Sequence, residues 1–210
     1  TSHRIFLYSG AQTTGITLKN NGWLVGQAAT GTSFDSVMGI APPSGFIARP
    51  TLNSTKPALS NASGSVVTLA DNNTVLGVAI SGGGTGPAVI SSGIVNTGLI
   101  GNATTSDVTI SGAAGGAFSL GAGNGAFSVN APITSVTGRS VAVTGRTGGI
   151  VAFPLAISDT GTGISLTTNT GATVNFTGGL SLSTGANIAF TATGGGTVNA
   201  TQNNSTIVNT

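Results

Sequence analysis

The sequence has 210 residues, of which 35 are glycine, and only six Lys or Arg and four Asp side chains carry a full charge. The cations are dispersed, which excludes a basic face for nucleic acid, and the absence of cysteine excludes a disulfide framework and a thiolate metal site. Because 39% of the residues are hydrophobic and regularly placed, we expect one folded, elongated domain over 1–210.

No apolar run approaches the roughly 18 residues that a membrane span needs, so no membrane span is expected. No basic and then apolar leader is present, and the chain starts at Thr1 without methionine. We therefore expect a processed product or an excised fragment.

Short strands are expected at the start of the chain. The segments 4–10 and 15–26 hold apolar runs bounded by Gly and Asn, which predicts two or three strands. Tyr8 and Trp23, each the single residue of its kind, are expected to close the first coil and shield its core. A stacking platform for a ligand is the alternative for Trp23.

The periodicity is lost over 27–65, which contains four of the seven prolines. A long loop that leaves a regular scaffold is where binding residues tend to lie. We expect 27–65 to be a binding excursion or a cap that covers the end of the domain. The candidate ligand-binding residues are the charged residues of this segment and the nearby tryptophan: Trp23, Asp35, Arg49 and Lys56.

Strand patterns resume over 66–90 and again from residue 107, and the interval between them is less regular. Phe118 and Val141 are separated by the same step as Leu120 and Val143, about 23 residues. This step recurs in the rest of the chain, so the repeat begins before its clearest copies.

The stretch 139–210 repeats one pattern three times. Alternating apolar pairs recur at a step of about 23 residues, longer by one at its second occurrence, in two series: Val141/Val143, Ile164/Leu166 and Ile188/Phe190, then Val151/Phe153, Val174/Phe176 and Val198/Ala200. A nearly constant step of this size is typical of a parallel β-helix, in which each coil buries its inward face against its neighbours. We predict an all-β solenoid with about 23 residues and three strands per coil, and about nine coils.

The repeat also predicts which side chains face inward. Phe153 is expected to stack on Phe176. The corner after the first strand is expected to keep its length to within one residue, with Thr144, Thr167 and Thr191 as equivalent positions. The predicted inward residues are Val141, Val143, Val151, Phe153, Ile164, Leu166, Val174, Phe176, Ile188 and Phe190. The predicted outward residues are Ala142, Ala152, Ser165, Asn175, Ser181, Ala189 and Asn199.

Three segments carry a family resemblance: 15–27, which includes GITLKN and LVGQ; VTLADNNTVLGVAI at 67–80; and GATVNFTGG at 171–179. They resemble the right-handed parallel β-helix proteins of the pectate-lyase-like class. More narrowly, they resemble the Gly/Thr/Asn-rich repeat regions of large bacterial secreted or surface proteins, such as autotransporter-like passengers. This resemblance implies a right-handed helix and an extracellular or cell-surface location.

No constellation for catalysis is visible. The polysaccharide-degrading members of that class use clustered carboxylates, whereas Asp35, Asp71, Asp107 and Asp159 lie far apart along the chain. His3 is the single histidine and has no nucleophile context, and no Lys follows the glycine runs at 82–86 and 121–125. We therefore expect no enzyme activity, no cofactor and no metal.

Three functions are considered. The first is a non-enzymatic structural or adhesive segment on a bacterial surface, which stacks end to end. The chain stops inside an expected strand without a cap sequence, so either the natural protein continues or another copy stacks there. The second is a carbohydrate-active enzyme or glycan-binding module that uses 27–65. The third is ice binding through Thr ladders, such as Thr191-Ala192-Thr193.

Overall fold

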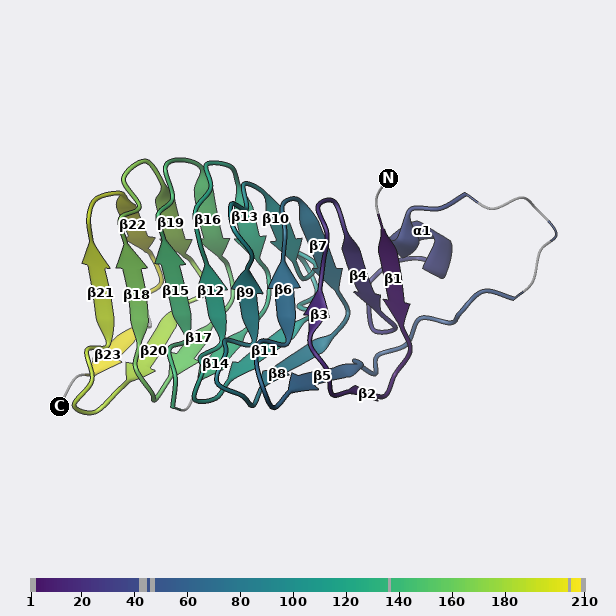
Figure 1. Cartoon of the computed structure of the whole chain (residues 1–210), viewed down its shortest axis with the longest axis horizontal. Coiled ribbons are helices and arrows are strands. Elements are labelled where there is room, and N and C mark those ends of the chain that lie inside the picture. Colours follow the sequence, from purple (N-terminus) through teal and green to yellow (C-terminus); the bar gives the residue numbers. More distant parts are fainter. Residues whose placement is uncertain (1–2, 42–44, 46–47, 136, 204, 209–210) are drawn as a thin grey trace.

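In a computed structural model, the chain forms a right-handed parallel β-helix with three strands per coil, as the repeat and the resemblance together predict (Figure 1). The structure describes residues 3–41, 45, 48–135, 137–203 and 205–208. Three parallel sheets, which we name A, B and C, run along the column with eight, eight and seven strands.

Each coil contributes one strand to each sheet, in the order A, B, C, except the last described coil, whose two strands belong to sheets A and B. Sheet A consists of β1 (Arg4–Leu7), β4 (Trp23–Gly26), β7 (Asn73–Leu76), β10 (Gly98–Ile100), β13 (Phe127–Val129), β16 (Ile150–Phe153), β19 (Thr173–Phe176) and β22 (Thr197–Ala200). Sheet B consists of β2 (Ala11–Gln12), β5 (Ala58–Asn61), β8 (Ala79–Gly82), β11 (Thr109–Gly112), β14 (Ile133–Ser135), β17 (Ile157–Asp159), β20 (Leu180–Ser183) and β23 (Thr206–Val208). Sheet C consists of β3 (Ile16–Thr17), β6 (Val67–Leu69), β9 (Val89–Ser91), β12 (Phe118–Leu120), β15 (Val141–Thr144), β18 (Ile164–Thr167) and β21 (Phe190–Thr193).

The core lies inside the column and is built by alternation along each strand. In β18, Ile164 and Leu166 are buried and Ser165 is partly exposed, and the same alternation recurs in β13 and β15. The rings of Phe153 and Phe176 are stacked with their centroids 5.1 Å apart and their planes at 10°, which confirms the predicted stack. Inward side chains therefore form continuous ladders because equivalent residues lie one strand spacing apart.

The last coil differs from the predicted register. Phe190, and not Ile188, pairs with Ile164, so the predicted pairing of Ile188 is wrong. Ile188 is 64% exposed in the turn before β21, whereas Ala189, predicted to face outward, is buried. The next corner is shorter by two residues, because Thr173 pairs with Thr197 as the repeat predicts. The predicted constancy of this corner therefore fails in the last coil.

The coil count is smaller than expected. Sheet A has eight strands, against the nine coils that a uniform step allows. The chain from Trp23 to its partner Thr74 is more than twice as long as a regular coil, and the chain from Leu99 to its partner Ser128 also exceeds one coil. Two insertions, one after β4 and one after β10, therefore lengthen their coils, so fewer coils fit into the 210 residues.

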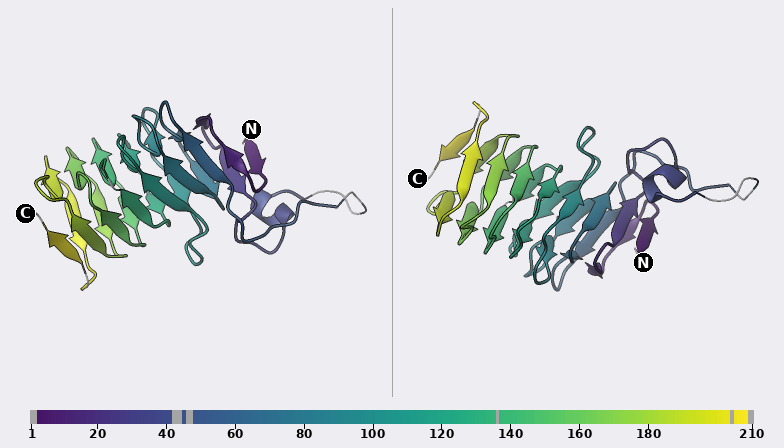
Figure 2. Two further views of the ribbon diagram at one scale, coloured as in Figure 1. Left: turned by 90° about the horizontal axis from the view of Figure 1, so that it is seen from below. Right: turned by 90° about the horizontal axis from the view of Figure 1, so that it is seen from above.

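The larger insertion joins β4 to β5 and contains a short helix, α1 (Phe34–Met38). The Ser33 side chain accepts a hydrogen bond from the Ser36 amide at the start of α1, and Gly39 ends the helix with φ of 56°. Helix α1 lies at the N-terminal end of the column, beside β1 and β4 (Figure 2).

The insertion covers an apolar part of the outer face of sheet A. A second hydrophobic cluster, separate from the core, joins residues of this face to residues of the insertion. Its members are Phe6, Trp23, Val25 and Leu76 from sheet A, and Ala29, Phe34, Val37, Met38 and Leu52 from the insertion. This burial holds the insertion against the side of the column, where its loop can meet neighbouring coils.

Candidate binding cleft between two insertions

Both insertions leave the column at the same corner, between sheets A and B. The first occupies 27–57 and the second 101–108, and the coil between them turns at Gly77 and Val78 alone. Gly77 has φ of 66°, and a Cβ there would overlap the backbone of Ala29. The short turn and its glycine therefore leave room for the first insertion to cross toward the second.

Polar contacts join the two insertions. The Thr30 amide donates to Asp107 Oδ2 at 3.1 Å, and the Thr105 hydroxyl donates to Thr30 Oγ1 at 2.6 Å. Lys56 Nζ donates to the carbonyl oxygen of Ser106 at 3.2 Å. Asp107 also accepts from the Asn102 amide at 2.7 Å, which fixes the second loop on itself.

A cleft of about 530 Å³ lies between these loops. Ligand sites in proteins commonly have volumes of this order. Its lining combines apolar side chains with side chains that carry hydroxyl, amide, ammonium and carboxylate groups. The lining residues are Ala28, Ala29, Thr30, Gly31, Leu52, Asn53, Ser54, Lys56, Thr105, Ser106 and Asp107.

Lys56 is the cation of this cleft. Burial lowers the pKa of its ammonium group, and the nearby Asp107 carboxylate opposes that shift. The net lowering indicates that the protein does not fully compensate the charge of Lys56. Of the four predicted ligand-binding residues, Lys56 is the one that lines the cleft.

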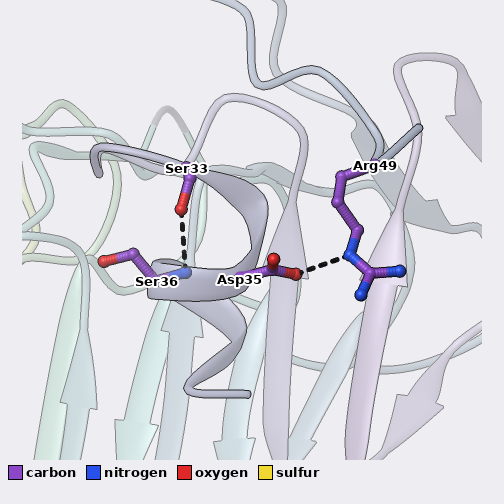
Figure 3. Close-up of polar contacts among 4 residues, drawn as sticks. All are labelled: Ser33, Asp35, Ser36 and Arg49. Atoms are coloured by element: carbon purple, nitrogen blue, oxygen red, sulfur yellow. Dashed lines mark hydrogen bonds and ion pairs between the residues drawn. The ribbon is translucent and has the colours of Figure 1, made fainter. Parts of the chain in front are cut away.

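Asp35 and Arg49 pair with each other. Arg49 Nε lies 3.0 Å from Asp35 Oδ1, and Figure 3 shows this pair beside the cap of α1. The pair joins the first turn of α1 to the part of the insertion that leads on to β5. Neither residue lines the cleft.

Trp23 lies on the outer face of sheet A in the second hydrophobic cluster. The Arg4 guanidinium carbon lies 4.3 Å from the centroid of its ring, a cation–π contact. Tyr8 is 62% exposed and meets the ring of Phe6 edge to face, so the expectation that it shields the core of the first coil is wrong. The structure therefore brings Trp23 to the first coils and does not bring it to Lys56.

The other aspartates bind backbone amides. Asp159, fully buried, accepts from the amides of Ser140 at 2.8 Å and Gly161 at 2.6 Å. Asp71 Oδ1 accepts from the amides of Asn96 and Thr97 at 2.8 and 3.0 Å. These carboxylates hold corners of the column, and their hydrogen bonds are made within the fold.

Arg146 has the complementary role at a corner between sheets C and A. Its side chain is fully buried and donates to carbonyl oxygens of two preceding coils: Val95 at 2.8 Å, Asn96 at 3.1 Å and Gly125 at 2.7 Å. Burial lowers the pKa of this guanidinium, and the Asp71 charge opposes the shift. The chain thus uses a buried cation to join three successive coils.

The residues that the structure describes include no group of three His, Cys, Asp or Glu side chains placed to hold a metal ion. In the same residues, no helix has the length and apolarity required to span a bilayer. Comparison with known proteins gives no match to a family model, to a curated protein or to a solved structure.

The sequence interpretation does not include the second insertion as a candidate. Its available signals are the irregular spacing between residues 94 and 110 and the aspartate that ends the polar run 102–107. Neither signal places this loop beside Lys56. The two loops meet because both leave the column at the corner between sheets A and B, in coils that lie two positions apart.

Asp71 predicts a pH dependence of stability. Hydrogen bonds from the Thr97 and Asn96 backbone lower its pKa below the ordinary value of 3.8. The contribution of ionised Asp71 to the free energy of unfolding is therefore complete above the pKa that Asp71 has in the unfolded chain. It is lost as the pH falls through the lower pKa of Asp71 in the folded chain. We expect the urea midpoint of the wild type to fall more steeply below pH 3.8 than that of Asp71→Asn. Equal slopes for the two proteins would contradict this role.

Proposed function

We propose that this chain is a non-enzymatic structural segment of an extracellular bacterial surface or filament-forming protein, and that copies stack end to end through their terminal coils. The observation that carries the proposal is the open apolar face of the last described coil. Val198 is 37% exposed and Ile207 is 52% exposed. Their partners one coil earlier, Val174 and Leu182, are buried.

The two ends of the column are complementary in geometry. Sheets A, B and C end in β1, β2 and β3 at one end and in β22, β23 and β21 at the other (Figures 1 and 2). All pairings between these sheet strands are parallel, so a second copy in the same orientation would continue every sheet. A contact of this head-to-tail kind does not close and generates a filament.

The inward residues at the first coil also suit such a contact. Ile5, which pairs with Leu24, is 39% exposed at that end. Unpaired strand edges with apolar residues favour addition of further strands when no charge opposes it. No charged side chain follows Asp159 in the sequence, which removes that opposition from the last coils.

The use of the carboxylates supports a non-enzymatic role. Asp71, Asp107 and Asp159 accept backbone hydrogen bonds, and Asp35 pairs with Arg49. A glycosidase requires two carboxyl groups that face one bond. The narrower assignment to autotransporter-like passengers is part of this proposal and is supported by the resemblance of the segments 15–27, 67–80 and 171–179.

Val198→Lys tests the stacking. In the 210-residue chain, it places an ammonium group on the inward face of the open coil, where a following coil would bury it without a partner. We expect sedimentation velocity to show concentration-dependent association of the wild type, and a dissociation constant at least about 100-fold higher for the variant.

Asn199→Lys is the matched control, because it adds the same charge to the same strand on the outward side. We expect it to weaken association much less than Val198→Lys does, because an outward ammonium group stays in solvent and is not buried by the following coil. A wild-type monomer that is insensitive to concentration, or equal effects of the two substitutions, would refute end-to-end stacking.

A further inference from the structure

The cleft between the insertions holds a cation with unused hydrogen-bonding capacity. An ammonium group has three N–H donors. Lys56 uses one of them on the Ser106 carbonyl oxygen, and the described part of the chain offers no partner to the other two. Burial lowers the pKa of Lys56 in spite of the nearby carboxylate, so an additional anion at this position would stabilise its charged form.

Asp107 does not take up these donors. Its Oδ1 accepts from the Asn102 amide within the second insertion, and its Oδ2 accepts from the Thr30 amide of the first insertion. Asp107 is 4% exposed, so its carboxylate lies beneath the loops. Both residues line the cleft, but Lys56 is partly exposed and therefore presents more of its side chain there.

The remaining lining specifies the rest of a ligand. Asn53 uses its side-chain oxygen on the Thr55 amide, which leaves the amide NH₂ as a donor. Ser54 and Ser106 add hydroxyl groups, and Leu52 provides an apolar wall. The carboxylate of Asp107 also belongs to the lining, but it is 4% exposed and both of its oxygens accept backbone amides. The partly exposed cation, the neutral polar groups and the small apolar surface therefore suit a hydroxylated molecule that carries one negative charge.

We propose that this cleft binds a small polyhydroxylated carboxylate, whose carboxylate contacts Lys56 and whose hydroxyl groups contact the polar side chains of both insertions. A single ammonium group matches a carboxylate better than a doubly charged phosphate, which proteins usually hold with more donors and charge. The cleft volume of about 530 Å³ accommodates a small polyhydroxylated carboxylate. This binding function goes beyond the stacking of coils and uses a different part of the molecule.

The first test compares two probes of nearly the same shape, D-gluconate and its uncharged counterpart D-glucitol. Titration of the ¹⁵N-labelled 210-residue chain is expected to shift the amide resonances of Thr30, Ser54 and Ser106 with gluconate. An open cleft and a ligand of this size predict a dissociation constant on the order of 1 mM. We expect glucitol to bind at least about tenfold more weakly, because a charge-assisted hydrogen bond is lost.

The second test is Lys56→Gln, which removes the charge and keeps a donor for the Ser106 carbonyl oxygen. We expect gluconate affinity to fall at least about tenfold. Lys19→Met, a change at an exposed lysine outside the cleft, is expected to leave it unchanged. Unchanged Thr30 and Ser106 amide shifts in unliganded Lys56→Gln would show that the loops remain joined.

Three results would overturn the proposal: equal binding of gluconate and glucitol, undiminished binding by Lys56→Gln, or gluconate-induced shifts that map outside the two insertions. Absence of any amide shift at gluconate concentrations well above the expected dissociation constant would also overturn it. The comparison of the two probes uses the wild type alone, so it decides the matter even if the variant fails to fold. Stacking is measured separately, so either proposal can fail without the other.

Discussion

Phe153→Ala is expected to lower the free energy of unfolding by about 3–5 kcal/mol. Phe153 is 1% exposed and lies between two other rings of the core. Its ring stacks on Phe176 at 5.1 Å and meets Phe118 edge to face at 5.7 Å. Truncation removes both contacts and leaves a cavity that the fixed spacing of the coils prevents from closing.

Phe190→Ala is the control for this prediction. Phe190 also contacts Phe176, with centroids 6.0 Å apart, but it belongs to the last strand of sheet C and is only partly buried. Its truncation opens a site that solvent already reaches, so we expect a clearly smaller loss. Urea unfolding followed by far-ultraviolet circular dichroism measures both variants, and equal losses would show that the aromatic ladder is not the centre of the core.

The aromatic ladder also shows what the sequence predicts well. Phe153 and Phe176 are separated by one step of the repeat, and each occupies the same place in an alternating strand. In a parallel β-helix, such a pair must lie in neighbouring coils on the same face. The coil architecture, the three strands and most inward residues follow from this single rule.

The repeat rule does not predict the register of the last coil. Ile188 and Phe190 point to the same face of an extended chain, so a shift by two residues leaves the alternation intact. The structure resolves the choice by placing Phe190 over Ile164 and Ala192 over Leu166. Counted between paired residues, the turn before β21 is three residues longer than the turn before β18, and a turn carries no periodic signal that would reveal the extra residues.

The cleft shows a second limit. Two of the bonds that join its loops use a backbone group, namely the amide of Thr30 and the carbonyl oxygen of Ser106. Every residue except proline offers such a donor, so the sequence does not reveal the partners. Asp107 and Lys56 are visible as isolated charges, but their proximity depends on the corner from which each insertion leaves.

The scarce charges acquire a common explanation in the structure. Asp71, Asp107, Asp159 and Arg146 each bind backbone groups at corners or insertions, where the chain leaves the sheet ladders. An unpaired buried amide or carbonyl group is costly, and a charged partner makes the stronger hydrogen bond. These four charged residues therefore satisfy backbone groups at irregular points of the solenoid.

Gly149→Ala is expected to destabilise the chain by about 3 kcal/mol or more. Gly149 has φ of 76°, a region that favours glycine, and a Cβ there would overlap the carbonyl group of Gly125 in the preceding coil. That carbonyl oxygen accepts a hydrogen bond from Arg146 at 2.7 Å. The methyl group therefore strains its own backbone and also displaces an acceptor of the buried cation.

Gly185→Ala separates these two causes. Gly185 also has a positive φ, 58°, but a Cβ there would meet no atom within 4 Å. We expect this control to lose only the backbone contribution, about 1–2 kcal/mol. The difference between the two urea midpoints then measures the close approach of successive coils at the corner that holds Arg146. Equal losses would mean that the coils can separate there at little cost, and that Arg146 does not hold them at a fixed distance.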